Sequence, residues 1–339
     1  MHNHRHDAGF TLIEALIATA LTIVVVGAGL SAFTKGMDIT ETSRIISETN
    51  QSLEVAESLM VRDFIQIGQG IPRGGVPIPT GAGAAAIPRP AQAGAALTFP
   101  GAWTTLPAVS PGPSLGPVVL GVATDVVTLM YADPTLSLNQ YPLVSVAADG
   151  SSMTVDNRTS ITGANGLKVG DVVLFTNPLG SAMQVVTQTN NNQTVNFGLN
   201  DALGLNQRGA AQGTIMNLQA GGAFPPTTAT RILIISYYLD TVTDPSLPRL
   251  QREVNGGVPL AIALGVENLQ MTYDFVDGVT NPTNQEAIPA ANSANQIRKI
   301  NLFMSARSLD LDRHTTQFYR NSIATQVGLR SLSFMDRYR

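Results

Sequence analysis

The feature that most constrains this chain is an uninterrupted apolar block near its N-terminus. It runs from Phe10 to Phe33, reads FTLIEALIATALTIVVVGAGLSAF and contains a single charged residue, Glu14. As a helix rising about 1.5 Å per residue, the block would be roughly 36 Å long, whereas the hydrocarbon core of a bilayer is about 30 Å thick. The sequence therefore predicts a membrane-spanning helix over residues 10–33.

A secretory signal peptide is the alternative explanation of this block. Such peptides have an apolar core of about 7–15 residues followed by a cleavage site of small residues, and Val26-Gly27-Ala28 could serve as that site. The block is long for such a core, which favours an anchor that stays in the protein. The chain has no cysteine, so disulfides and thiol chemistry are excluded and the redox compartment is not defined.

Glu14 is the anomalous residue of the block, because a carboxylate at mid-membrane costs on the order of 2.5–3.5 kcal/mol. A plain anchor has no use for it, so an acid at this place implies a partner. Glu14 lies near one end of the span, where the cost is smaller, and a tolerated interfacial acid is the simpler alternative. The position of Glu14 relative to Gly9 favours the interpretation that this acid has a partner.

The segment around Glu14 resembles the type III signal of type IV prepilins and of type II secretion pseudopilins. It reads GFTLIE from Gly9 to Glu14 and follows a short polar leader, residues 1–9. The resemblance implies that a prepilin peptidase cuts between Gly9 and Phe10 on the cytoplasmic side and that the new amine of Phe10 is methylated. In the family this glutamate is thought to neutralise the N-terminal amine of a neighbouring subunit. Thr11 and Glu14 are accordingly the candidate assembly residues.

The leader MHNHRHDAG departs from the family pattern in its charges. Its positive charge comes from Arg5 and the initiator amine, while three histidines and Asp7 stand where lysines are usual, so orientation by positive charge is weak. The histidines could be read as a metal-binding tract, but a polar leader that is removed is the preferred interpretation. They are His2, His4 and His6.

Beyond Phe33 the apolar residues recur at spacings of three, four and seven, with charged and polar residues between them, which predicts an amphipathic helix over residues 34–67. Gly68, Gly70 and Pro72 end it. The whole helix, residues 10–67, would be about 87 Å long, and its apolar stripe should lie against the following domain. The expected stripe residues are Ile39, Ile46, Leu53, Met60, Phe64 and Ile67.

The rest of the chain divides into a linker and a β-rich head. Residues 68–117 hold ten glycines and ten prolines and predict an extended loop or partly disordered linker, which could fold onto the domain surface. Residues 118–339 alternate short β-like runs with turn residues, which predicts a mostly antiparallel β domain and an α+β fold class overall. The runs are 126–131, 143–147, 153–155, 172–175, 184–188, 194–197, 232–239 and 300–308.

Several segments of the helix end and the head resemble the PilW family of minor pilins, in the family's order along most of the chain. They are LMVRDF at 59–64, ATDVV at 123–127, VGDVVLF at 169–175, SYYL at 236–239, LQRE at 250–253, GVENLQMTY at 265–273, the strand 300–308 and VGLR at 327–330. Residues 65–70 lack the aromatic and the cysteine that many relatives have there. Pseudopilin J of type II secretion, which shares a long helix and a β-rich head, is a close alternative.

Sequence motifs of enzymes are missing, so we expect no catalytic activity and no cofactor. No Gly-x-Ser-x-Gly string and no Walker loop occur, and His314 is the only histidine outside the leader. Two polar groups could hold a metal, Asp310 with Asp312 and His314, and Asp274 with Asp277, Asn281 and Asn284. Solvent-facing strand and loop polarity is the preferred interpretation of both, and no metal site is expected.

The resemblance implies a structural role in pilus assembly, at initiation or at the filament tip. The expected partners are the prepilin peptidase, other pilin or pseudopilin subunits, the inner-membrane assembly platform and lipid. A net charge of −4 does not suggest nucleic-acid binding. The expected location is the bacterial inner membrane, single-pass, with the head in the periplasm and, after assembly, in an extracellular pilus. A binding module such as a tip adhesin is the alternative. A concave aromatic-lined surface would favour it, yet the only tryptophan, Trp103, lies in the linker.

Overall fold

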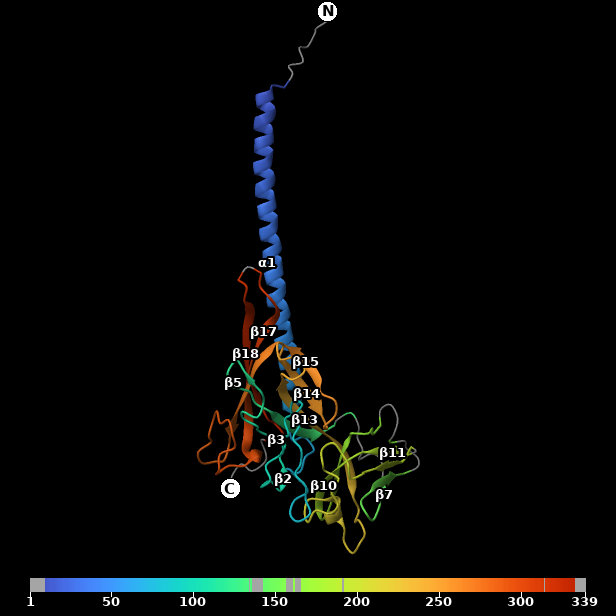
Figure 1. The fold of residues 1–339 in the computed structure, drawn as a ribbon. Helices are drawn as coiled ribbons and strands as arrows, with labels where there is room; N and C mark the ends of the chain where they lie inside the picture. The colour runs from blue at the N-terminus through green and yellow to red at the C-terminus, as the bar shows by residue number, and fades with distance from the viewer. Residues whose placement is uncertain are drawn as a thin grey trace, which may run out of the picture.

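The computed structural model describes residues 10–133, 135, 143–156, 161, 166–190, 192–313 and 315–332. A long helix, α1, leads into a body of β-strands, and the C-terminal part of the helix lies within that body (Figure 1). Every paired strand in the described residues is antiparallel to its partner. The α+β fold class with a long N-terminal helix is therefore confirmed.

α1 spans Leu12–Gln66, close to the predicted range, and its capping residues are Thr11 and Ile67. It ends where Gly68 and Gly70 take positive φ angles of 77° and 69°, which glycine adopts without steric cost. Residues 10–40 are exposed over their whole length. By length and composition α1 is the one helix in the described part of the chain that could cross a membrane.

The buried stripe of α1 differs in part from the prediction. Ile39 is exposed and Ile46 is half-buried, because the body first reaches the helix at Glu41 and covers a face that begins at Ile45. The expected residues Leu53, Met60, Phe64 and Ile67 are buried. The buried side chains of the helix are Ile45, Thr49, Leu53, Ala56, Met60, Asp63 and Phe64.

A seven-stranded sheet forms one side of the core, and its long central strand is β13, Thr228–Asp240. β13 pairs with β9 through its first part, with β6 in the middle and with β14 through its last part. The other members of the sheet are β3 (Val109–Ser110), β6 (Val127–Ala132), β9 (Val172–Asn177), β10 (Gly180–Val185), β14 (Arg249–Val254) and β15 (Leu260–Leu264).

A three-stranded sheet covers the other side of α1 and consists of β16 (Val266–Phe275), β17 (Ile297–Leu311) and β18 (Phe318–Gly328). Side chains of α1, of this sheet and of the seven-stranded sheet form one continuous core. The two sheets join at Gly265, whose φ is +71° and where a Cβ would lie 2.4 Å from the carbonyl oxygen of Arg307. Only glycine fits there, which explains why β15 can turn directly into β16.

A small four-stranded sheet packs beside the seven-stranded one, and the two share a core to which β9, β10 and β13 contribute side chains. Its strands are β7 (Leu143–Val146), β8 (Ser152–Val155), β11 (Gln188–Asn190) and β12 (Thr194–Asn196). The single strand predicted at 184–188 is wrong, because the chain leaves β10 at Val185 and enters β11, in a different sheet, at Gln188. Two short 3₁₀ helices, η2 (Ile215–Leu218) and η3 (Ala294–Gln296), complete the elements.

Residues 68–117, expected as a linker, have little regular structure but contribute to the body. Their strands are short, β1 (Val76–Pro77), β2 (Thr105–Leu106) and β3, and a fourth, β4 (Val118–Val119), pairs with β5 (Val122–Ala123) just beyond. Val76, Leu106 and Val109 are fully buried or nearly so. The segment thus supplies apolar side chains to the cores. The sequence did not predict this, because the apolar residues of the segment are irregularly spaced.

A buried carboxylate joins α1 to the seven-stranded sheet. Asp63 is fully buried and accepts hydrogen bonds from the hydroxyl of Tyr131 at 3.0 Å, from the hydroxyl of Tyr237 at 2.7 Å and from Nε of Arg252 at 2.8 Å. Burial, and secondly the Asp63 charge, raise the pKa of both tyrosine hydroxyls, so both remain donors at neutral pH. Three separate strands, β6, β13 and β14, are therefore fastened to one point on the helix.

Asp63→Ala should lower the free energy of unfolding by about 3 kcal/mol, because Arg252 and two tyrosine hydroxyls would lose their acceptor while staying buried. The measurement is urea unfolding of the full-length protein in detergent micelles, followed by the emission of Trp103. Glu54→Ala, an exposed acid on the same helix, is the matched control and should change the free energy by less than about 0.5 kcal/mol. Equal effects of the two substitutions would contradict this role of Asp63.

Candidate functional site

The candidate processing and assembly site lies at the N-terminal end of α1. Gly9 lies outside the described residues, and Phe10, which is 86 % exposed, is the first residue described. Thr11 is the N-cap of the helix, with extended backbone angles (φ −79°, ψ 152°). Such angles with a hydroxyl side chain are typical of an N-cap, so the helix begins at the second residue after the predicted cleavage point.

Thr11 and Glu14 form a capping box. The amide of Glu14 donates to Oγ1 of Thr11 at 3.3 Å, and the amide and hydroxyl of Thr11 donate to Oε2 of Glu14 at 3.1 and 3.0 Å. Two amides that would otherwise lack a partner at the helix start are thereby satisfied. The two residues expected to act in assembly thus lie together and fix each other's side chains.

The carboxylate of Glu14 retains capacity for a further partner. Both contacts with Thr11 involve Oε2, and Oε1 accepts no hydrogen bond from any of the described residues. The side chains around it, Phe10, Ile13 and Leu16, are apolar and exposed. A carboxylate in such surroundings can accept N–H bonds from an ammonium group of another molecule, an arrangement that would offset the desolvation of both charges.

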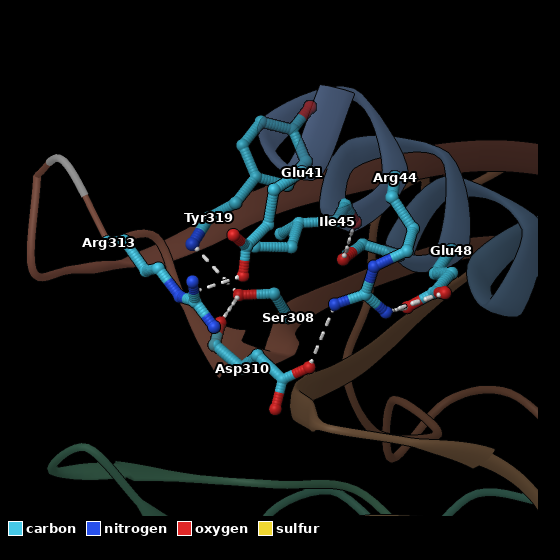
Figure 2. A network of polar contacts seen from close by, with 9 residues as sticks. Glu41, Arg44, Ile45, Glu48, Ser308, Asp310, Arg313 and Tyr319 are labelled. Atoms are coloured by element: carbon cyan, nitrogen blue, oxygen red, sulfur yellow. Dashed lines mark hydrogen bonds and ion pairs between the residues drawn. The ribbon is translucent and has the colours of Figure 1, made fainter. Parts of the chain in front are cut away.

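Beyond the apolar part of α1, the β17–β18 hairpin reaches along the helix and is held by charged contacts (Figure 2). Arg44 bonds Glu48 at 2.9 Å and Asp310 at 3.2 Å, and Arg313 lies 3.2 Å from Glu41. These side chains are largely exposed, and such pairs contribute only about 0–1 kcal/mol each. They add little stability, and the packing of β17 and β18 on the helix depends mainly on the shared core.

The acidic residues of the two polar groups considered as metal sites have partners within the chain. In the described part of the chain no three His, Cys, Asp or Glu side chains lie close enough to hold a metal ion, and His314 lies outside it. Asp274 pairs with Lys299 at 2.6 Å. Asp277 accepts the backbone amides of Val279 and Thr280, so its oxygens serve the loop.

Other buried ionisable groups of the body also have partners within the chain. Glu267 accepts from Arg320 at 2.7 Å and lies 3.2 Å from Arg307. Glu253, whose pKa is raised by burial, accepts the hydroxyl of Tyr238 at 2.7 Å. These are the arrangements of a fold held by polar networks, and none brings a nucleophile and a base together.

The sequence patterns did not identify Asp63 as the residue that joins α1 to the seven-stranded sheet. It appeared only within the segment 59–64, as part of a family resemblance. A signal was present, since Leu53, Ala56, Met60 and Asp63 continue the same three- and four-residue spacing, which places an acid on the apolar face of the helix.

Comparisons with known proteins agree with the N-terminal motif. A family model described as the prokaryotic N-terminal methylation motif matches residues 4–30. Searches of curated proteins and of solved structures gave no match. The match covers residues 4–9 of the leader, the capping box and most of the apolar part of α1, so a type IV pilin-like prepilin signal is present, and the body is described by its structure alone.

Thr11→Ala should loosen the first turn of α1, because the amide of Glu14 would lose its acceptor. Loss of an N-cap costs about 1 kcal/mol, which corresponds to roughly fivefold faster hydrogen exchange of that amide. The measurement is amide exchange of the full-length protein in detergent micelles. Thr11→Ser keeps a hydroxyl at this position and should exchange as the unaltered protein does; an equally slow exchange in Thr11→Ala would contradict the cap.

Proposed function

We propose that this chain is a type IV pilin-like subunit, made as a prepilin and cut between Gly9 and Phe10, whose function is assembly into a pilus or pseudopilus. The methylation motif over residues 4–30 carries the proposal. One helix able to cross a membrane, followed by an antiparallel β body, supports it. The role is structural rather than catalytic.

Glu14 is the residue to which we assign the assembly contact. In the proposed filament its carboxylate pairs with the methylated amine of Phe10 in a neighbouring subunit. The geometry that supports this is the orientation of Oε2 by Thr11 while Oε1 takes no partner from the described residues. The pairing offers one explanation of an acid within an apolar span, since each charge would remove the cost of burying the other.

The proposed division of the chain follows from this role. Residues 1–9 form the leader that is removed, 10–33 the membrane span and 34–67 the amphipathic part of the helix. The head then lies in the periplasm, connected through residues 68–117 and formed mainly by residues 118–339. A prepilin peptidase, other pilin or pseudopilin subunits, the inner-membrane assembly platform and lipid are the proposed partners.

The finer proposal is a minor, PilW-like subunit that acts in initiation or at the tip of a filament. A bulky head is easier to accommodate there than in a subunit repeated many times. Membership of a secretion pseudopilus, in the manner of pseudopilin J, is the alternative. Both belong to the same functional class and share the processing step.

One observation favours a second candidate function, a binding module displayed by the filament. Trp103 lines an open groove of about 420 Å³ together with the segment 288–295, at the end of the body far from the N-terminus of α1. Phe99 stacks on the indole with ring centroids 6.2 Å apart. A half-exposed aromatic beside amide and hydroxyl side chains is suited to binding a ligand.

Co-expression with a prepilin peptidase should yield a membrane-extracted chain that begins at methylated Phe10. The measurement is the intact mass and N-terminal sequence of the protein, made with and without the peptidase. The chain made without peptidase should keep its leader. A chain that begins near Gly29, or one that stays uncut in both preparations, would contradict the proposed class.

Glu14→Ala should leave processing at Phe10 intact and reduce incorporation into sheared filaments by at least tenfold, because an unpaired amine would be left in the membrane interior. The measurement is immunoblotting of the filament and membrane fractions. Glu54→Ala removes an exposed acid from the same helix and should be incorporated normally. Unchanged incorporation of Glu14→Ala would exclude the pairing.

A further inference from the structure

The groove beside Trp103 has an uncharged lining. It lies mainly between residues 102–107 and residues 288–295, and its volume of about 420 Å³ falls in the range of about 300–1,000 Å³ that is usual for small-molecule sites. Among the described residues, none that lines the groove is charged. A charged ligand would find no opposite charge there, so the groove suits a neutral ligand.

The indole of Trp103 is held in place by a stack that begins in the interior. Arg89 is 4 % exposed, and its guanidinium carbon lies 5.4 Å from the centre of the Phe99 ring. Phe99 in turn stacks on the indole, with an angle of 26° between the two planes. Because Arg89 donates hydrogen bonds to the backbone carbonyls of residues 110–111 and of Val126, the inner end of the stack is fixed to the body.

Phe99 covers only part of the indole. Phe99 and Trp103 together line a different cavity, of about 310 Å³, whereas Phe99 does not line the groove. The groove is therefore lined by the part of the indole that Phe99 leaves uncovered. The face of an aromatic ring carries partial negative charge, and the C–H bonds of a pyranose ring carry partial positive charge, so a sugar ring can pack on this surface.

Three polar side chains that line the groove have no hydrogen-bond partner within the described residues. Thr104 and Thr105 lie on one wall and Asn295 on the other. Neither the two hydroxyls nor the side-chain amide of Asn295 bonds to any of the residues that the structure describes. A hydroxyl can donate and accept, and an amide side chain offers two donors and an acceptor. These are the groups that pair with the hydroxyls of a sugar.

Both walls of the groove are ordered by contacts elsewhere in the body. Thr105 belongs to β2, which pairs with β1. Asn295 lies in η3 between Ala294 and Gln296, which are both buried, so η3 presents Asn295 to the groove. A site that is already ordered loses little conformational entropy on binding.

We propose that the groove beside Trp103 binds a neutral saccharide. The fixed indole would receive the C–H face of a sugar ring, and the unpaired groups of Thr104, Thr105 and Asn295 would bond its hydroxyls. The inference rests on the second proposed function, a binding module displayed by the filament, and names the class of its ligand.

The position of the groove excludes lipid as the occupant. β2 lies at the end of the body opposite the N-terminus of α1 (Figure 1), so this end faces away from the membrane when the apolar part of α1 spans it. Sites that stack nucleic-acid bases normally lie in positively charged grooves, and this groove is uncharged. Proline-rich peptides also bind to aromatic-lined grooves and are therefore the competing ligand in the test.

The emission of Trp103 reports on the groove directly, because this is the only tryptophan of the chain. The full-length protein, in micelles of a detergent without a sugar headgroup, is titrated with chitohexaose, cellohexaose and maltohexaose and is applied to a printed panel of neutral glycans. We expect at least one neutral oligosaccharide to change the emission in a saturable way. No binding of any of them by the folded protein, or saturable binding of decaproline in their place, would overturn the proposal.

Asn295→Ala and Thr104→Ala each remove polar groups from one wall without breaking a hydrogen bond to the described residues. Each should weaken binding of the best oligosaccharide about three- to tenfold, because hydrogen bonds to the sugar are lost, and should leave the melting temperature unchanged. Asn200→Ala, which removes an exposed amide in another loop, is the matched control and should bind as the natural chain does. Equal affinities of all three variants would overturn the assignment of these walls.

Trp103→Ala should abolish binding, measured by calorimetry because the fluorophore is lost, while Trp103→Tyr keeps an aromatic face and should retain part of it. Full binding by Trp103→Ala would overturn the role of the indole. Processing at Phe10 and incorporation into filaments are measured for the same variants and should be unchanged. A natural chain that is processed and incorporated but binds no saccharide would reject this site and leave the proposed assembly function in place.

Discussion

The buried carboxylate of Asp63 is the interaction on which the arrangement of helix and head depends. An isolated charge could not stay in that core, because its desolvation costs several kcal/mol. Tyr131, Tyr237 and Arg252 each donate to it, and they come from three neighbouring strands of one sheet. This favours one docking register of the helix, since a shift by one turn would take the buried Asp63 away from all three donors.

Two carboxylates of α1, Asp63 and Glu14, show how the same physical cost leads to opposite outcomes. Asp63, near the end of the helix, receives its full set of donors from within the chain. Glu14, in the first turn, receives donors only from Thr11, and only at one oxygen, among the described residues. Asp63 is thus fully hydrogen-bonded within the subunit. Glu14 keeps an oxygen that can accept a hydrogen bond from another molecule in a medium without water.

Local patterns were sufficient to predict the helix, its ends and the fold class. The apolar block, the spacing beyond it and the cluster around Gly68 and Gly70 depend on neighbours in sequence alone. Pairings over long distances were not predictable: β10 and β11 lie in different sheets although the sequence suggested one strand, and residues 68–117 are irregular yet packed. The motif alone singled out Phe10, Thr11 and Glu14, whose roles stay predictions, whereas the partners of Asp63 are 68 to 189 residues away.

Anchoring in a membrane changes what the exposed surfaces of the head need to achieve. Subunits held in one plane by α1 meet at a high effective concentration, so weak contacts between heads can suffice once the helices are together. A contact between two heads that would be too small to hold soluble proteins together can then be enough. In the proposed filament such contacts would determine the orientation of each head relative to the next.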